Sequence, residues 1–354
     1  MKILYHIIHV NEIRRNRQEN PIADLANPLP GTDLESAIGS LPGVLAPRAK
    51  SLIVTVLGDA LVPHGLTPRG AAVWLGSLIT LLAPFGINER AVRTSVLRLV
   101  REDWLVAKPR GRRSYYSLTD AGRQRIADSA RRIYPSPRWD WDGRWHFVFT
   151  GLGEIAGDDR ARLRRMLRWL GFGVVASNVF AHPRADLDGL AHALAELRLE
   201  DQIVTLRAGP EDMFADKPRH DLLGHIWNLD ELSVAYRQFI DRFAPFGGSI
   251  ADRNVPSPPA AFTLRILLMH EYRRVQLRDP GLPAELLPSD WPGMEAWTLA
   301  RDLYRKLAAP SQIHLTTGAE TEAGPLPPLA ASFGDRFGGI DGIESAPRPE
   351  RRIG

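Results

Sequence analysis

The amino-acid sequence predicts an α+β fold built from three consecutive parts. A helix followed directly by a basic hairpin occupies residues 88–118, strand and helix patterns alternate over residues 145–206, and long apolar helices dominate after residue 221. A chain of 354 residues, 44% of them hydrophobic, is long enough to fill several cores. We therefore expect an extension over 1–46, domains over 47–134, 135–215 and 216–310, and a flexible tail over 311–354.

The composition excludes several classes of protein. The chain has no cysteine, which rules out disulfides, thiolate catalysis and cysteine zinc sites. It contains no run of 18 apolar residues, and its first residues lack the apolar segment of a signal peptide. We expect a cytoplasmic protein that has no membrane partner and that needs no metal or cofactor.

The first part begins with helical segments. Residues 50–59 form a compact apolar helix, and residues 69–82 form a second, strongly apolar one. A turn at 84–86 leads into a helix over 88–101, for which Asn88 is the expected N-cap. The apolar stripe of this helix consists of Val92, Val96, Leu99 and Val100.

A strand pair follows this helix at once. The strands at 104–108 and 114–118 are joined by an arginine-rich turn, and Thr119 then caps a helix that runs to about Ile133. A short helix that carries arginines and small polar residues, followed by a hairpin with a basic tip, is typical of a winged helix-turn-helix. Such a helix fits the major groove of DNA, and the wing reaches phosphates or the minor groove.

The charge distribution supports a polyanionic partner. Residues 81–132 contain twelve Lys or Arg against five Asp or Glu, a local excess of seven in a chain whose net charge is only +4. A solvated basic face without a partner is the alternative. The candidate DNA contacts are Asn88, Arg90, Arg93, Thr94, Ser95 and Arg98 on the helix, and Arg110, Arg112, Arg113 and Tyr115 in the wing, where Tyr115 and Tyr116 alternate and one of them faces the core.

The middle part alternates strands and helices. Strands at 145–150, 173–181 and 202–206 alternate with helices at 158–170 and 187–199, which is a split βαβ, ferredoxin-like order. The third part is helical over 221–243, 260–278 and 293–308, and the segment after Pro310 is rich in Gly and Pro.

Several blocks resemble a known family, the PaaX-type repressors of phenylacetic acid degradation operons, in the family's own order over roughly residues 47–310. The blocks are KSLIVTVLGD (50–59), VWLGSLI (73–79), LAPFGINER (82–90), VRTSVLRL (92–99), GRRSYYSLTDAG (111–122), WDGRW (141–145), HEYRR (270–274) and LLPSDWPG (286–293). The resemblance implies an N-terminal winged helix, a central Cas2-like domain and a helical C-terminal domain. It also implies a homodimer that binds a double-stranded DNA operator and is released by phenylacetyl-CoA.

The HEYRR block is the candidate effector site. A zincin would need a second histidine where Arg274 stands, so we expect no zinc here. Arginines suit the phosphates of coenzyme A, and the candidate residues are His270, Tyr272, Arg273 and Arg274, on a helix expected to lie outside the winged domain. A helix held by internal ion pairs is the alternative.

Other functions remain open at this point. A relative of these repressors could respond to a different acyl-CoA or act as an activator. A Cas2-like domain could also carry nuclease chemistry, which needs carboxylates at strand ends. Asp158 and Asp159 follow the first strand but begin a helix, where acids are favoured by the helix dipole, so we expect no enzymatic activity.

Overall fold

The computed structural model describes residues 33–137, 140–209, 223–224, 226–250 and 254–340. The chain divides into two compact units, each made of segments distant in sequence. Among the described residues, unit 1 comprises those of Pro137–Gln238 and Arg274–Glu295, and unit 2 comprises those of 33–136, Phe239–Arg273 and 296–340. The expected helical third domain is therefore not a compact unit by itself, because its long helices contribute residues to both. These helices are α10 (Leu229–Ser249), α11 (Pro258–Gln276) and α12 (Gly293–Gly318).

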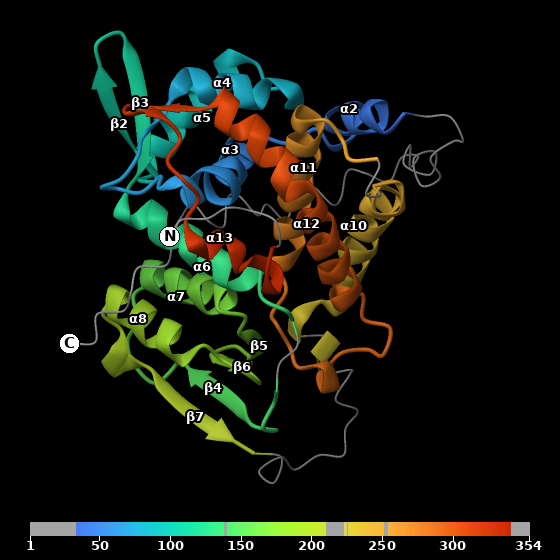
Figure 1. The fold of residues 1–354 in the computed structure, drawn as a ribbon. Coiled ribbons are helices and arrows are strands. Elements are labelled where there is room, and N and C mark those ends of the chain that lie inside the picture. Colours follow the sequence, from blue (N-terminus) through green and yellow to red (C-terminus); the bar gives the residue numbers. More distant parts are fainter. Residues whose placement is uncertain (1–32, 138–139, 210–222, 225, 251–253, 341–354) are drawn as a thin grey trace, which may run out of the picture. The chain divides into compact units, whose positions relative to one another are not determined.

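Unit 2 contains the helices and the hairpin expected over 47–134, and also the helix α2, which lies in the expected extension (Figure 1). In order they are α2 (Leu34–Leu45), α3 (Ala49–Thr55), the π-helix η2 (Val56–Leu61), α4 (Leu75–Leu82), the short 3-10 helix η4 (Ala83–Phe85), α5 (Glu89–Arg101), β2 (Leu105–Arg110), β3 (Arg113–Leu118) and α6 (Asp120–Ile133). Both predicted N-caps are confirmed. The Asn88 side chain accepts a hydrogen bond from the Ala91 amide at 2.9 Å, and the Thr119 hydroxyl accepts one from the Gly122 amide at 2.9 Å.

The hairpin turn is tighter than the sequence indicated. The register pairs Arg110 with Arg113, so only Gly111 and Arg112 form the loop. Gly111 has a φ of 60°, the conformation in which a two-residue turn favours glycine at its first position. The turn therefore presents the Arg112 side chain at its tip.

The hairpin belongs to a five-stranded sheet with the order β2-β3-β1-β8-β9. Strand β1 (Val73–Trp74) pairs with β3, which corrects the helix expected over 69–82: that helix begins only at Leu75. Strands β8 (Glu320–Thr321) and β9 (Gly324–Pro325) come from the far end of the chain. Thr321 pairs with Val73, so the C-terminal segment extends the same sheet.

The expected flexible tail is wrong for residues 311–340. Helix α12 continues to Gly318, and beyond the hairpin β8–β9 the short helix α13 (Ala331–Gly334) packs into unit 2. Phe333 and Phe337 are each only 1% exposed, and this burial outweighs the helix-breaking Gly and Pro around them. The extension also differs from expectation, since Ile38 and Leu41 of α2 are buried. Residues 1–32 and 341–354 lie outside the described residues.

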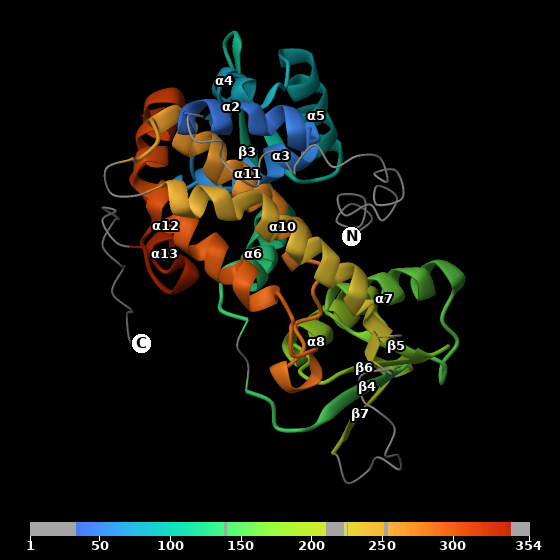
Figure 2. The same ribbon diagram turned by 90° about the vertical axis from the view of Figure 1, so that its right-hand side faces the viewer.

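Unit 1 has the expected ferredoxin-like order, with one additional strand. Its elements are β4 (Trp145–Phe149), α7 (Gly157–Trp169), β5 (Gly173–Ala176), β6 (Val179–His182), α8 (Leu187–Leu197) and β7 (Val204–Ala208). The single strand expected over 173–181 is in fact the hairpin β5–β6. The antiparallel sheet has the order β5-β6-β4-β7 (Figure 2).

Both faces of this sheet are covered by apolar residues of unit 1. Val148 and Phe180 pack with residues of α7 and α8 such as Leu163 and Leu190, and both helices lie on this face (Figures 1 and 2). On the opposite face, Trp145 and Ala181 pack against a second cluster that includes Leu223, Leu229, Leu282 and Leu286. A two-faced core of this kind stabilises an α+β layer structure.

Truncation of a C-terminal aromatic side chain tests whether this segment is structural. We predict that Phe333→Ala lowers the free energy of unfolding by about 3–5 kcal/mol, because it opens a cavity in a closed core. The matched control is Ser332→Ala at the exposed neighbouring position, for which the change should stay within about 0.5 kcal/mol. Chemical denaturation monitored by circular dichroism measures both, and equal stabilities would mean that this segment contributes nothing to folding.

Candidate nucleic-acid interface

Helix α5 has one buried and one exposed face. Val92, Val96 and Leu99 are at most 1% exposed and anchor the helix in unit 2. Ser95 is also buried, at 7% exposed, which corrects the prediction that its hydroxyl reads DNA. Ser95 lies three residues from Val92 and four from Leu99, and residues at this spacing share a helix face.

The exposed face of α5 is basic with one apolar side chain at its centre. Asn88 at the cap and the predicted contacts Arg90, Arg93, Thr94 and Arg98 are all exposed. The candidate contacts did not include Leu97, which is 54% exposed, or Arg101, which lies off the apolar stripe and is also exposed. The positions 90, 94, 97 and 101 are three or four residues apart and therefore lie on one helix face, so the sequence already indicated that residues 97 and 101 share the exposed face of Arg90 and Thr94.

The arginines of this face differ in their partners. Arg93 forms an ion pair with Glu89 one turn earlier, at 2.7 Å. Within the described parts of the chain, the guanidinium groups of Arg90, Arg98 and Arg101 have no hydrogen-bond or ion-pair partner. They are therefore available for a ligand without the loss of an existing contact.

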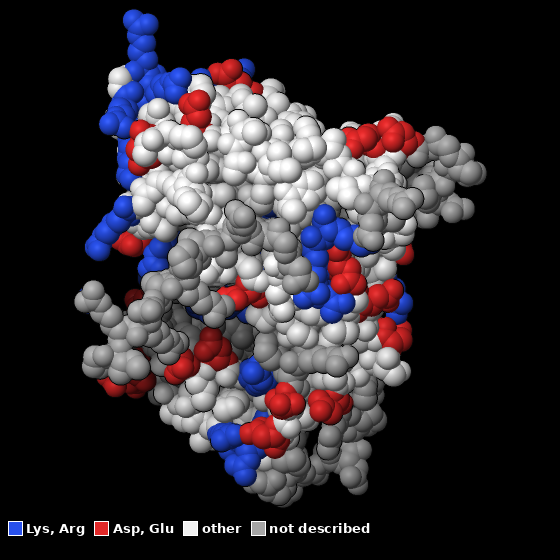
Figure 3. Space-filling view, in the orientation of Figure 1, with Lys and Arg blue, Asp and Glu red and all other residues white. Residues whose placement is uncertain are grey.

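The hairpin β2–β3 carries the second group of predicted contacts. Lys and Arg side chains gather over this hairpin (Figure 3). Arg112 is exposed at the tip, whereas Arg113 pairs with Glu320 at 2.9 Å and Arg110 donates to the Glu322 carbonyl oxygen at 2.6 Å. Hydrogen bonds with Tyr115 and Glu320 raise the pKa of Arg113.

Tyr115 does not form part of the exposed surface. Tyr115 and Tyr116 are both 7% exposed, so the expectation that one of them stays free for phosphate contact is wrong. Tyr116 and Tyr115 face Val73 and Trp74 across the sheet, and the pairing with β1 covers this strand on the side away from β2. This pairing joins distant parts of the chain, which the local sequence pattern does not reveal.

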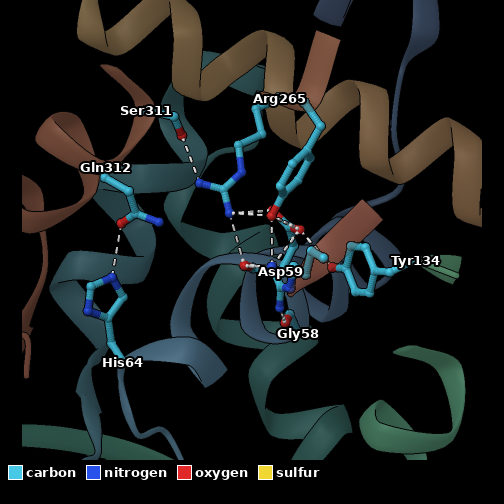
Figure 4. A network of polar contacts seen from close by, with 9 residues as sticks. Gly58, Asp59, His64, Tyr134, Arg265, Ser311 and Gln312 are labelled. Carbon is cyan, nitrogen blue, oxygen red and sulfur yellow. Dashed lines mark hydrogen bonds and ion pairs between the residues drawn. The ribbon is translucent and has the colours of Figure 1, made fainter. Parts of the chain in front are cut away.

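A buried ion-pair network lies inside unit 2 (Figure 4). Asp59 lies on the π-helix η2 and is 4% exposed. Its carboxylate forms ion pairs with Arg265 of α11 at 2.8 Å and with Arg336 at 3.1 Å. The hydroxyls of Tyr134 and Tyr304 donate to the same carboxylate at 2.8 and 2.9 Å. One carboxylate thus joins segments from four places in the sequence.

The protonation states in the network are fixed by burial and charge. Burial raises the pKa of Tyr304 to about 12, so its hydroxyl remains a donor at neutral pH. Burial alone would lower the pKa of Arg336, but Tyr134, Tyr304 and Asp59 raise it above the ordinary value. Arg265 also donates to Ser311 at 3.2 Å, so two cations share one buried anion and several neutral acceptors.

The predicted effector residues lie at a contact between α11 and α3. His270 is within 3.0 Å of the Thr55 hydroxyl, and Arg273 donates to the carbonyl and the hydroxyl of Ser51 at 3.1 and 3.0 Å. His270, Tyr272 and Arg273 belong to unit 2, which corrects the expectation that the helix lies outside the domain with the basic hairpin, whereas Arg274 begins a segment of unit 1.

Burial differs among these four residues. Tyr272 is fully buried between Phe239 and Phe337, His270 and Arg273 are also buried, and Arg274 alone is exposed. An effector-binding role for the four residues stays a prediction.

The carboxylates considered for nuclease chemistry do not form a site. Asp158 and Asp159 lie in the first turn of α7, and Asp159 pairs with Arg162 at 3.2 Å. Among the described residues, no three His, Asp or Glu side chains gather closely enough to hold a metal ion. No helix in the described ranges has the length and apolar character needed to cross a membrane.

Sequence comparison relates most of the chain to one group of proteins. Models of the PaaX-like protein, the PaaX protein central Cas2-like domain and the PaaX-like protein C-terminal domain match residues 48–122, 138–219 and 227–317. The transcriptional repressor PaaX of Escherichia coli (strain K12) is 33% identical over 312 residues, which cover 88% of this chain and 95% of that protein. This chain belongs to the PaaX family.

Family membership indicates the class of protein and the type of the central domain. The curated PaaX relative is a transcriptional repressor, so the chain belongs to a family of regulators and not of enzymes. The ferredoxin-like sheet of unit 1 is the Cas2-like domain of PaaX proteins. Among solved structures, the uncharacterized protein Rv0674 from Mycobacterium tuberculosis is 26% identical in sequence to this chain. The match covers 72% of this chain and 96% of that chain, with a TM-score of 0.43.

The buried carboxylate of this PaaX protein allows a stability test. We predict that Asp59→Asn lowers the free energy of unfolding by about 3–5 kcal/mol, because it leaves two buried guanidinium groups without their counter-charge. Asp302→Asn is the control, since it removes an exposed carboxylate whose pair with Arg301 costs little to lose. Thermal and urea unfolding measure both variants, and a stability of Asp59→Asn equal to that of the control would contradict a structural role for the network.

Proposed function

We propose that this protein is a homodimeric transcriptional repressor of phenylacetate degradation genes that acts in the cytoplasm and leaves its operator when phenylacetyl-CoA binds. The observation that carries the proposal is the pairing of an exposed basic helix with a basic hairpin in a member of the PaaX family. We interpret α4, α5 and β2–β3 as a winged helix-turn-helix, with α5 as the recognition helix and the hairpin as the wing.

The geometry of α5 suits the major groove. Thirteen residues form the helix, and its exposed arginines project from the face opposite the buried stripe. Arginine binds guanine through two hydrogen bonds, and an apolar side chain such as Leu97 suits the methyl group of thymine. The exposed Arg112 at the wing tip suits a phosphate, which contributes affinity without sequence preference.

A chain of contacts connects the predicted effector residues to α5. His270 and Arg273 contact Thr55 and Ser51 of α3, and α3 packs against α5. A ligand that displaces His270 or Arg273 would therefore act on the helix that supports the recognition helix. Such a ligand releases DNA only if it binds the DNA-free form more tightly than the DNA-bound form.

A DNA-binding titration tests the proposed function. The purified protein is titrated onto its own upstream DNA and onto an unrelated duplex of equal length, with and without phenylacetyl-CoA, acetyl-CoA and free coenzyme A. We expect specific binding that phenylacetyl-CoA relieves and the other two do not. Equal affinity for both duplexes would exclude the repressor function. Release by a different acyl-CoA would change only the identity of the effector and leave the repressor function standing.

The recognition helix gives the third prediction. Arg98→Ala should weaken specific operator binding by about 1–3 kcal/mol, because the side chain is exposed and unpaired among the described residues. Arg237→Ala removes an equal charge from α10, where the arginine pairs with Asp290, and should leave operator affinity unchanged. Fluorescence anisotropy at a fixed salt concentration measures both, and equal affinities of the two variants would remove Arg98 from the interface.

The effector site gives the fourth prediction. Arg274→Ala should weaken phenylacetyl-CoA binding about ten- to a hundredfold, because a charge-assisted bond to phosphate is lost. Since Arg274 is exposed, the variant should fold and keep the parent's DNA affinity without effector. Calorimetric titration beside a melting curve measures this, and normal effector affinity in the folded variant would place the effector elsewhere.

A further inference from the structure

The C-terminal hairpin β8–β9 contacts the two arginines that flank the wing tip. Glu320 pairs with Arg113 at 2.9 Å, and both side chains are about half exposed, at 55% and 50%. The Glu322 carbonyl oxygen accepts from Arg110 at 2.6 Å. Of the three arginines at 110–113, only Arg112 has no partner within the described residues.

The hairpin is held firmly where these contacts form. The Ala72 amide donates to the Glu322 carboxylate at 2.6 Å, and the Glu322 amide donates to the Ala72 carbonyl at 3.2 Å. The amide of Glu320 donates to the Ser77 hydroxyl at 2.9 Å, and Thr321 is buried at 4% exposed. The hydrogen bonds of the neighbouring backbone therefore fix the position of Glu320 next to Arg113.

The register of the sheet places the charges on one face. Arg110 pairs with Arg113, Trp74 pairs with Tyr115, and Val73 pairs with Thr321, so Arg110, Arg113, Trp74 and Glu320 share a face because side chains alternate along each strand. The Arg113 guanidinium lies 4.3 Å from the centre of the Trp74 ring. The wing arginine is thus held between an aromatic ring and a carboxylate.

A carboxylate at this position competes with DNA phosphate. An exposed ion pair is weak, so a phosphate can replace Glu320 at Arg113, but the displaced carboxylate stays close and repels the phosphate. Phosphate contacts provide sequence-independent affinity, which the repulsion reduces more at low salt than at high salt.

We propose that the C-terminal hairpin is an internal acidic competitor for DNA phosphate, in which Glu320 restrains Arg113 and lowers the affinity of the wing for DNA. This proposal rests on the proposed function. Because the restraint acts on a contact without sequence preference, it weakens specific and non-specific binding alike. The ratio of the two affinities, which depends on the bases that α5 reads, is then unchanged, and unrelated DNA holds the repressor less tightly.

The test replaces Glu320 by its uncharged isostere. Glu320→Gln should tighten binding to the operator and to an unrelated duplex by about two- to fivefold at low salt, the strength of one exposed ion pair. The slope of log affinity against log salt should steepen by up to about 0.9, the value for one added phosphate contact. In an Arg113→Ala background, Glu320→Gln should tighten binding by clearly less than in the parent, because no arginine remains there to hold the phosphate. Asp302→Asn, an equal charge change at an exposed ion pair on α12, should leave affinity and slope as they are.

Each outcome decides a separate question. Unchanged or weaker DNA binding by a folded Glu320→Gln variant overturns the proposal, as does the same gain with Arg113 absent, which would indicate a general charge effect. Glu320→Ala, checked by its melting curve, repeats the measurement in case the amide forms a new bond to Arg113. If the parent protein binds no DNA, the proposed function is wrong. If the parent binds DNA but the Glu320 variants bind it no more tightly, only the proposed role of the C-terminal hairpin is wrong.

Discussion

The ordered state of unit 2 depends on one buried carboxylate. Asp59 accepts from two tyrosines and pairs with two arginines, and its partners come from the end of α6, from α11, from α12 and from the segment after α13. Removal of water from three charged groups is unfavourable unless each is paired, so these segments must all be in place before the arrangement becomes stable. The network therefore makes the described parts of 239–273 and 296–340 part of the same folding unit as α5 and the hairpin.

This constraint explains why a Gly- and Pro-rich segment reaches the wing. Arg336 and Phe333 fix the segment beyond the hairpin, because Arg336 donates to the Gly58 and Asp59 carbonyl oxygens and stacks on Tyr134 and Phe333. The end of α12 fixes the other side. The hairpin β8–β9 between these two anchors is short and has little freedom to leave β1. An acidic residue on it can consequently hold one orientation toward Arg113.

Local signals predicted the parts of the structure that local interactions determine. The stripe and cap of α5, the basic two-stranded hairpin and the capped α6 follow from helical spacing, side-chain capping and turn chemistry over a few residues. The two-residue strands β1 and β8 are too short to carry such a signal, and the pairing of Val73 with Thr321 joins positions about 250 residues apart in sequence. Tyr115 was misjudged for the same reason, since its strand is covered by the pairing with β1. Ser95 is different, because its spacing from Val92 and Leu99 was a local sign that it lies on the buried face of α5. The aromatic residues Phe333 and Phe337 were the available sign that the tail packs.

The same contacts bear on how an effector signal could reach DNA. Arg265 and Arg273 leave the same helix, two turns apart, and end on Asp59 of η2 and Ser51 of α3. The region of α11 that carries the predicted effector residues is thus bonded to the segment that α5 packs against, and no flexible linker intervenes among the described residues. A ligand that displaces α11 would disturb both bonds together. A rigid transmission of this kind favours an all-or-none change in the orientation of α5 over a gradual one, because packed cores switch between discrete arrangements.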